Sequence, residues 1–122
     1  LFTGLVEREE LLGWLQHSDI QVVPARFMNS GAVVVESWIS GTPVIQSGAV
    51  DPNLVEPGKN GWLFPTADVD ALAARMREAL ANRTALRSMA EAGRALVMEK
   101  YTYEYLNRLY LETYRRITGT AS

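Results

Sequence analysis

A short apolar run, a glycine-containing turn, a helical stretch and a second apolar run follow one another in the first half of the chain. The apolar runs cover residues 20–24 and 43–47, and the turn at residues 29–32 opens a helix expected from about Gly31 to Ser40. Nearly continuous apolar runs are typical of strands covered on both faces, as in parallel sheets. This order predicts a parallel α/β unit in which a helix crosses over between two strands.

The segment before residue 20 is expected to add one strand and one helix. Residues 2–6 form a short apolar run that predicts a strand. The acidic stretch at residues 7–10 suits the first turn of a helix, because the helix macrodipole favours negative charge there. Leu11, Trp14 and Leu15 give this helix an apolar stripe.

The second half is expected to be mainly helical, after a polar loop over residues 48–61 and a short strand over 62–64. Thr66 or Asp68 is expected to cap the first of three helices. Each of the three helices is expected to have one apolar side. In the first helix these residues are Val69, Leu72, Ala73, Met76 and Leu80, and in the second they are Leu86, Met89, Ala90, Gly93 and Val97. In the third they are Tyr103, Leu106, Tyr110, Tyr114 and Ile117. Gly93 on an apolar face predicts a close contact, since glycine otherwise weakens a helix by about 1 kcal/mol relative to alanine.

Length and composition exclude several classes of protein. At 122 residues the chain is one domain or less, and its net charge of −2 gives no general attraction for nucleic acid. With no cysteine and one histidine, it has neither disulfides nor a thiolate or multi-histidine metal site. It starts without methionine inside an apolar run, so we expect a piece of a longer protein. Without a leader or a long apolar run, we expect a cytoplasmic protein.

The turn at residues 29–32 is the candidate binding segment. Asn29 or Ser30 is expected to cap the helix, and Gly41 fits the position just after its end. A helix N-terminus that follows a parallel strand is where α/β proteins hold phosphates. Glu36 lies about one turn inside this helix and offers a carboxylate to sugar hydroxyls. The segment therefore suits a nucleotide or a nucleotide-sugar.

Several short motifs occur along the whole chain in an order that is characteristic of one family. They are Phe2-Thr3-Gly4, Glu10-Leu11, Ser18-Asp19-Ile20, Val23-Pro24, Gly31, Glu36, Gly41-Thr42-Pro43-Val44 and Asn60-Gly61-Trp62-Leu63-Phe64. With these motifs the chain resembles the C-terminal, donor-binding half of GT-B glycosyltransferases, specifically glycosyltransferase family 4.

The resemblance implies an α/β fold, a Rossmann-like parallel sheet that is the incomplete C-terminal half of a GT-B fold. Residues 1–122 would be part of the nucleotide-sugar domain, with residues 66–118 as its helical C-terminal part. The complete protein would transfer a sugar, with retention, from a nucleotide-sugar to a glycan, a lipid-linked acceptor or a small molecule. The first strands, a basic phosphate-binding pair and the acceptor domain would lie upstream. No cofactor or metal is implied, and the complete protein would be cytoplasmic or peripheral to the membrane.

The resemblance also assigns site residues, position by position. Glu36 matches the second Glu of a paired motif, which accepts hydrogen bonds from the ribose hydroxyls. Gly31, with Ser30 and Ala32, would approach the donor sugar and diphosphate through the backbone. Gly4 and Leu5 match the edge of the base pocket.

One position departs from the family pattern. The first Glu of the pair, which contacts the donor sugar, is Met28 here, and the Pro-Phe that usually follows is Asn29-Ser30. Either the sugar is recognised differently, through Asn29 and Ser30, or donor binding is altered. We favour a subfamily variation, because Gly31 and Glu36 are kept.

Alternatives stay open at this point. Glu36 taken alone is an ordinary helical glutamate, and Arg26 near the end of the strand over residues 20–24 is either a phosphate partner or a surface residue. The chain as a whole is either part of an enzyme or a non-catalytic binding or assembly module derived from one. A non-hydrolysing epimerase is disfavoured by the single histidine. The tyrosine-rich last helix is expected to pack on the upstream domain, and its exposed side would allow self-association.

Overall fold

The computed structural model describes residues 1–27, 31–51 and 53–119. In this part of the chain, three short strands form one sheet in the order β1 (Gln21–Val23), β2 (Val44–Ser47) and β3 (Trp62–Phe64). Both pairs are parallel, with Val22 opposite Ile45 and Ile45 opposite Trp62. The predicted parallel α/β arrangement is confirmed.

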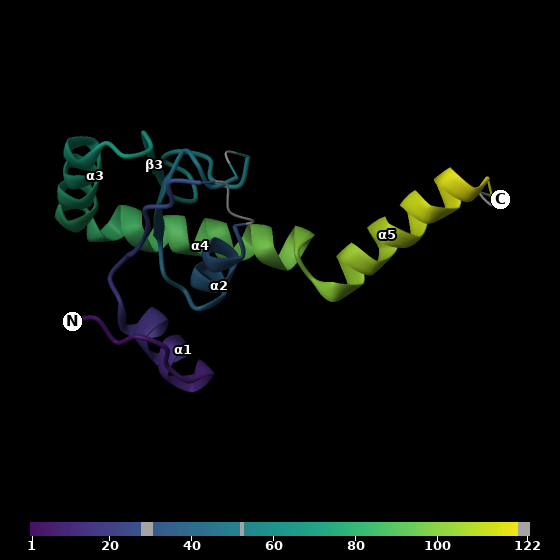
Figure 1. Ribbon diagram of the computed structural model, residues 1–122, viewed down its shortest axis with the longest axis horizontal. Coiled ribbons are helices and arrows are strands. Elements are labelled where there is room, and N and C mark those ends of the chain that lie inside the picture. The colour runs from purple at the N-terminus through teal and green to yellow at the C-terminus, as the bar shows by residue number, and fades with distance from the viewer. Residues whose placement is uncertain (28–30, 52, 120–122) are drawn as a thin grey trace.

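The described residues form five helices, and α5 projects away from the sheet (Figure 1). They are α1 (Arg8–His17), α2 (Ala32–Ile39), α3 (Val69–Ala81), α4 (Arg83–Lys100) and α5 (Tyr103–Thr118). The order β1, α2, β2 is the predicted crossover unit, and α3 to α5 make up the predicted helical segment.

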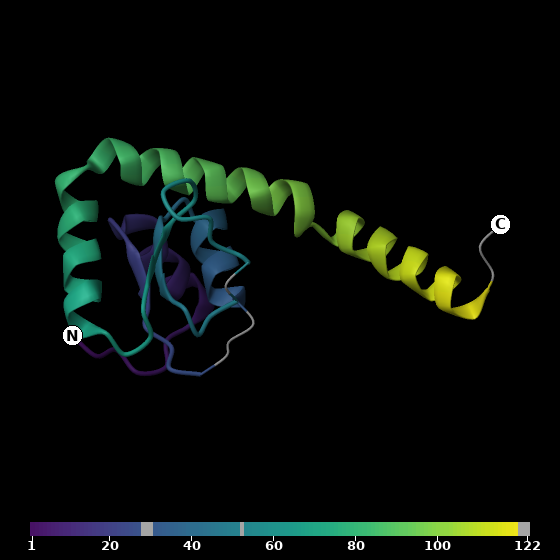
Figure 2. The ribbon, with the colours of Figure 1, turned by 90° about the horizontal axis from the view of Figure 1, so that it is seen from above.

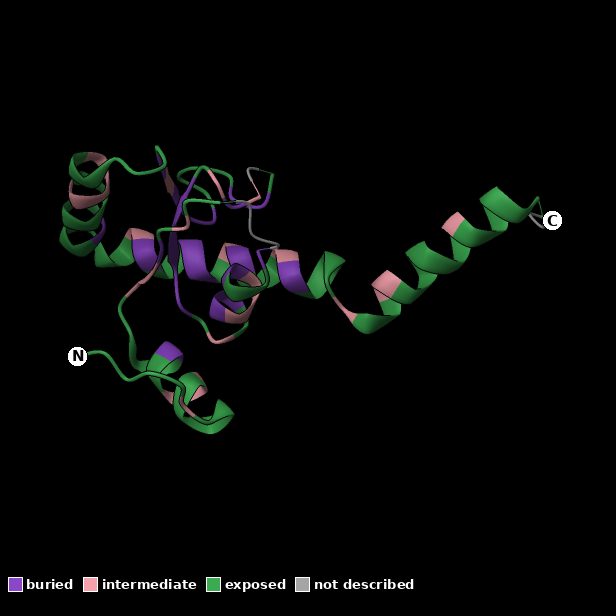
Figure 3. Ribbon diagram, viewed as in Figure 1, coloured by how far each residue is buried: buried purple, intermediate pink, exposed green. Residues whose placement is uncertain are grey.

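Two apolar clusters form the core, one on each side of the sheet. Successive strand residues point to opposite faces, so Val44 of β2 belongs to a cluster with α2, whereas Ile45 belongs to a cluster with α3. Helix α4 contributes to both, through Val97 in the first and Leu86 and Met89 in the second. The single helix α4 therefore ties the two layers together, and its buried side is visible in Figure 3.

Helices α2 and α4 meet where Trp38 lies against Gly93. Trp38 is fully buried, and a Cβ added at Gly93 would lie 2.3 Å from its Cδ1 atom. The indole Nε1 donates a hydrogen bond of 3.0 Å to the carbonyl oxygen of Asn60. The close contact predicted from Gly93 is confirmed, and its partner is a tryptophan ring.

Side-chain caps define where the last three helices begin. The side chains of Asp68, Asn82 and Thr102 each accept a hydrogen bond from the amide three residues later, which satisfies one of the free N–H groups of the first turn. Of the two predicted caps for the first of these helices, Thr66 and Asp68, the structure uses Asp68.

The strand predicted for residues 2–6 is wrong. This segment has no strand conformation, and Leu1, Phe2 and Leu5 are fully exposed. A strand needs a neighbour to satisfy its backbone groups. In the described chain, β1 to β3 form the only sheet, and none of them pairs with residues 2–6.

Several predicted apolar stripes are only partly buried. In α2, Ile39 is exposed and Ser37 is buried. The Ser37 hydroxyl donates to the carbonyl of Thr42 at 3.2 Å, which satisfies the buried polar group. In α1 only Leu15 is buried, and in α3 only Ala79. All five apolar residues predicted for α4 are buried. Burial thus follows which elements lie nearby rather than the periodicity of each helix alone.

Helix α5 extends away from the body of the molecule (Figure 2). It has no buried residue, and Tyr103, Tyr110, Tyr114 and Ile117 are exposed. Its apolar side therefore lacks a packing partner within the described residues. No helix in this part of the chain combines the length and apolarity needed to cross a membrane.

The contact between Trp38 and Gly93 predicts the effect of two alanine substitutions. Gly93→Ala should destabilise the chain by about 1–3 kcal/mol, because the new methyl group overpacks a filled core. Gly13→Ala, in a helix position with no atom within 4 Å of the new Cβ, should be neutral or stabilise by up to about 1 kcal/mol. Urea unfolding of both variants measures the difference, and equal stabilities would contradict the packing described.

Candidate functional site

The N-terminus of α2 lies beyond the carboxyl end of β1. Gly31 caps the helix with a φ of 74°, in the left-handed region that favours glycine. Its carbonyl accepts the first helical hydrogen bonds, from Val34 at 2.9 Å and Val35 at 3.1 Å. The cap is therefore Gly31 and not Asn29 or Ser30 as predicted, because the glycine itself makes the turn into the helix. The amides of Ala32 and Val33 fall in the first turn, where a helix has no internal acceptor for them.

Leu54 covers one side of Gly31. A Cβ added at Gly31 would lie 2.5 Å from Cδ2 of Leu54, which is itself buried. The family resemblance implied one role for Gly31, a close approach of its backbone to the ligand. The structure adds two others, a left-handed cap and a seat for Leu54.

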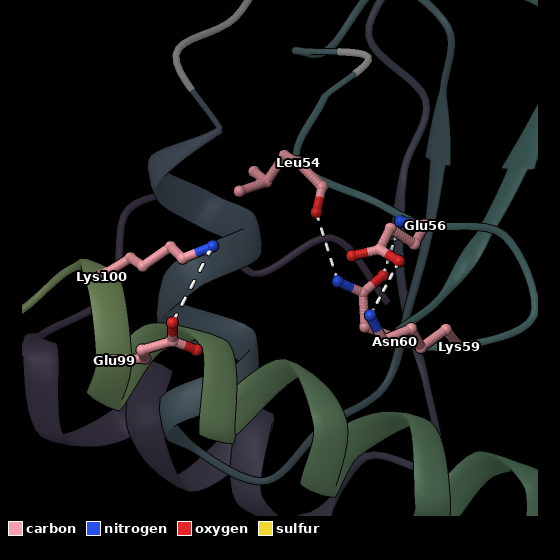
Figure 4. Close-up of polar contacts among 6 residues, drawn as sticks. All are labelled: Leu54, Glu56, Lys59, Asn60, Glu99 and Lys100. Carbon is pink, nitrogen blue, oxygen red and sulfur yellow. Dashed lines mark hydrogen bonds and ion pairs between the residues drawn. The ribbon is translucent and has the colours of Figure 1, made fainter.

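Asn60 holds Leu54 in this position (Figure 4). Its side chain is 2% exposed, donates from Nδ2 to the carbonyl of Leu54 at 3.3 Å, and accepts from the amide of Glu56 at 2.7 Å. Lys59 and Glu56 close the same loop on its exposed side with an ion pair of 2.8 Å. Asn60 thus links the β3 side of the sheet to the cap of α2.

The sequence analysis placed Asn60 only within a family motif and missed this role. The signal available was its place beside Gly61, directly before a buried strand, where a polar side chain needs internal partners. Gly61 is also packed, since a Cβ there would lie 2.8 Å from the carbonyl oxygen of Val44.

Glu36 is half-buried on α2, one turn from the cap. Among the described residues, no hydrogen bond or ion pair of its carboxylate is present. A half-buried carboxylate close to a helix N-terminus is suited to accepting hydrogen bonds from a ligand. Of the predicted residues, the structure brings Gly31, Ala32 and Glu36 together on one helix.

The loop after β2 closes the same side of the sheet. Gln46 is fully buried and donates from Nε2 to the carbonyl of Asp51 at 3.1 Å, while its Oε1 has no partner in the described chain. The Asp51 carboxylate accepts from the amide of Asn53 at 2.9 Å, as turn chemistry predicts.

The Tyr101 hydroxyl has a raised pKa. Burial is the main cause, and the negative charge of Asp51 raises the pKa further.

The remaining predicted site residues do not join this group. Leu5 is fully exposed, and Figures 1 and 2 place the N-terminal segment that carries Gly4 and Leu5 away from the start of α2. Met28, Asn29 and Ser30 lie outside the described residues. Within residues 1–27, 31–51 and 53–119, no three His, Asp or Glu side chains gather into a group that could hold a metal ion.

Comparison with known proteins identifies the family. The family model described as glycosyl transferases group 1 matches residues 1–82, which include the α2 segment and the loop that covers it. The chain belongs to this family. Its sheet and helices are those of an incomplete, Rossmann-like C-terminal half of a GT-B glycosyltransferase.

Two curated relatives illustrate the sequence similarity. The lipopolysaccharide core biosynthesis glycosyltransferase of Rhizobium meliloti is 25% identical over 89% of this chain and 34% of its own length. The sulfoquinovosyl transferase of Arabidopsis thaliana is 31% identical over 84% of this chain and 21% of its own length. The chain thus spans about a fifth to a third of the length of these group 1 glycosyl transferases.

Two solved structures illustrate the similarity in fold. Sucrose-phosphate synthase from Thermosynechococcus elongatus superposes with a TM-score of 0.87 at 28% identity, covering 99% of this chain and 31% of that protein. HepE of Anabaena in complex with UDP superposes with a TM-score of 0.78 at 22% identity, covering 84% of this chain and 29% of that protein. At that identity, the likeness to HepE concerns the fold alone.

The cap of α2 leads to a prediction about stability that separates the cost of the left-handed backbone from the cost of the contact with Leu54. Gly31→Ala should cost the left-handed penalty of about 1–2 kcal/mol and a further amount for the contact with Leu54. Gly41→Ala is the matched control, since Gly41 has a φ of 83° but no atom within 4 Å of the added Cβ.

The two variants are compared by urea unfolding, alone and combined with Leu54→Ala. Gly31→Ala should cost more than Gly41→Ala, and Leu54→Ala should remove much of the excess, giving a coupling of about 0.5–3 kcal/mol. Additive effects of Gly31→Ala and Leu54→Ala would show that Leu54 does not pack on the cap.

Proposed function

We propose that this chain forms the donor-nucleotide half of a glycosyltransferase active site. The observation that carries the proposal is the family match over residues 1–82, which contains a helix N-terminus and an uncommitted Glu36 carboxylate on one short helix. Names of the curated relatives support sugar transfer, and the UDP complex of HepE supports a nucleotide ligand for a domain of this fold.

The chemistry divides between the two ends of the proposed site. The first-turn amides of α2 stabilise the diphosphate, on which negative charge builds as the sugar leaves. The Glu36 carboxylate accepts hydrogen bonds from the ribose hydroxyls and so fixes the nucleotide. Met28, Asn29 and Ser30 would contact the donor sugar. Binding needs no metal ion or cofactor in this proposal.

We infer that transfer requires more than these 122 residues, because the chain spans only about a fifth to a third of the length of its curated relatives. We infer that the complete protein contains an upstream acceptor domain, performs retaining transfer, and accepts a glycan, a lipid-linked acceptor or a small molecule. The chain by itself would bind nucleotide without turning over. The exposed apolar side of α5 would pack against the upstream domain in the complete protein and would favour self-association of the chain alone.

A non-catalytic module is the second candidate function. The observation in its favour is Met28, which provides no carboxylate where the family places one. Incubating the complete protein with common nucleotide-sugars separates the two candidates, because hydrolysis or transfer with any of them excludes a non-catalytic module.

The role of Glu36 leads to a binding prediction. Glu36→Gln should weaken binding of the preferred nucleoside diphosphate about tenfold or more, since hydrogen bonds to a charged group contribute roughly 1.5–3 kcal/mol. Calorimetric titration with UDP, ADP and GDP identifies that nucleotide and measures the change. Glu91→Gln, on the exposed side of α4, is the matched control and should bind normally.

The ribose assignment is tested with a 2′,3′-dideoxy nucleoside diphosphate. This ligand should bind wild type weakly and should lose little further affinity in Glu36→Gln, because the hydroxyls that the carboxylate contacts are missing. In the complete enzyme, Glu36→Ala should lower both donor affinity and transfer. Wild-type affinity and transfer in that variant would refute the assignment.

A further inference from the structure

A second recess lies at the carboxyl edge of the sheet, on the side that faces α3. It has a volume of about 210 Å³ and is formed where the chain leaves β1, where it leaves β3 and where α3 begins. Its walls include Pro24, Arg26, Phe64, Ala67, Val69 and Leu72. In α/β proteins, ligands bind outside the carboxyl ends of parallel strands, so this edge is the functional one.

Arg26 is the uncommitted charge of the recess. It is exposed, and its guanidinium forms no hydrogen bond or ion pair with any described residue. The other charged group, Asp68, is already engaged, since its carboxylate accepts the amide of Ala71 at 2.8 Å and caps α3. The positive end of the α3 dipole offsets the Asp68 charge. A ligand at this edge therefore meets a free guanidinium.

The rest of the recess is apolar. Phe64 is 5% exposed and forms the floor with Leu72, while Pro24 and Val69 lie around it. The volume falls below the roughly 300–1,000 Å³ of pockets that enclose a drug-sized ligand. It is enough for one end of an apolar group, with the remainder of the ligand outside.

The backbone is strained at the rim of this recess. Ala67 has a φ of 64° and is the only non-glycine residue of the described chain with a positive φ. A left-handed alanine costs roughly 1–2 kcal/mol, and such strain is concentrated at functional sites. The turn that carries Ala67 separates Phe64 of β3 from Asp68 at the start of α3.

We infer that this recess binds an anionic amphiphile, with a phosphate held by the Arg26 guanidinium and an apolar group on Phe64 and Leu72. The planar guanidinium matches a phosphate in a bidentate manner. A role for this ligand as the acceptor of the sugar would rest on the proposed function, whereas the binding site itself does not.

Hexyl phosphate is the probe, with inorganic phosphate and 1-hexanol as its two halves. Titration of the chain, followed by calorimetry and amide chemical shifts, should show hexyl phosphate binding at least tenfold more tightly than either half. Arg26→Gln should lower this affinity at least tenfold. Arg87→Gln, at an exposed arginine in a separate recess on the opposite edge, should leave it unchanged.

UDP, titrated in parallel, distinguishes this site from the donor site. Arg26→Gln should leave UDP affinity unaltered, and an equal loss for UDP and hexyl phosphate would place Arg26 in the donor site and overturn the inference. Equal affinities for phosphate and hexyl phosphate, or no binding of either, would overturn it as well. If the chain binds hexyl phosphate but does not bind UDP, the recess is supported and the proposed donor role is rejected. Failure of this inference can therefore be told apart from failure of the proposed function.

The source of the phosphate is distinguished with vesicles. Sedimentation with phosphatidylcholine vesicles that contain phosphatidic acid, in a manner that Arg26→Gln abolishes, would indicate a phosphorylated lipid. Binding to hexyl phosphate without sedimentation would indicate a soluble organic phosphate. Both results support the inferred chemistry.

Discussion

The packing of Trp38 on Gly93 determines where α2 lies, and the site is part of α2. The same indole donates a hydrogen bond to the carbonyl of Asn60. The Asn60 side chain binds the carbonyl of Leu54, and Leu54 lies on Gly31 at the start of the helix. A continuous series of contacts thus runs from α4, across the core, to the amides proposed to bind a diphosphate. No step of it lies on the surface, so the position of the helix N-terminus is set by the core.

This arrangement holds the nucleotide end of the proposed donor site in a fixed position. The cap and Glu36 belong to a helix held on both sides, as the fixed positioning of a leaving group requires. The sugar end, at residues 28–30, lacks the family carboxylate, and the recess beside Arg26 lies at the same sheet edge.

The sequence predicted the sheet, the crossover helix, most helix ends and every buried residue of α4, because those features follow from local patterns. It failed where burial depends on distant neighbours. Residues 2–6 have the composition of a strand but pair with no strand of the described chain, and Ser37 tolerates burial because Thr42 supplies an acceptor for its hydroxyl. Asn60 and Leu54 were missed for the same reason, since their roles arise only when the loop before β3 folds over α2. The family resemblance located Gly31 and Glu36, whereas the structure explains why a glycine is needed at that cap.

The central claim is that the first turn of α2 receives a diphosphate. Amide chemical shifts of the labelled chain, followed during titration with UDP and separately with uridine, test it most directly. The amides of residues 31–33 should shift strongly with UDP and little with uridine, because only the diphosphate reaches the helix N-terminus. Shifts confined to other residues, or the same shifts with both ligands, would contradict it.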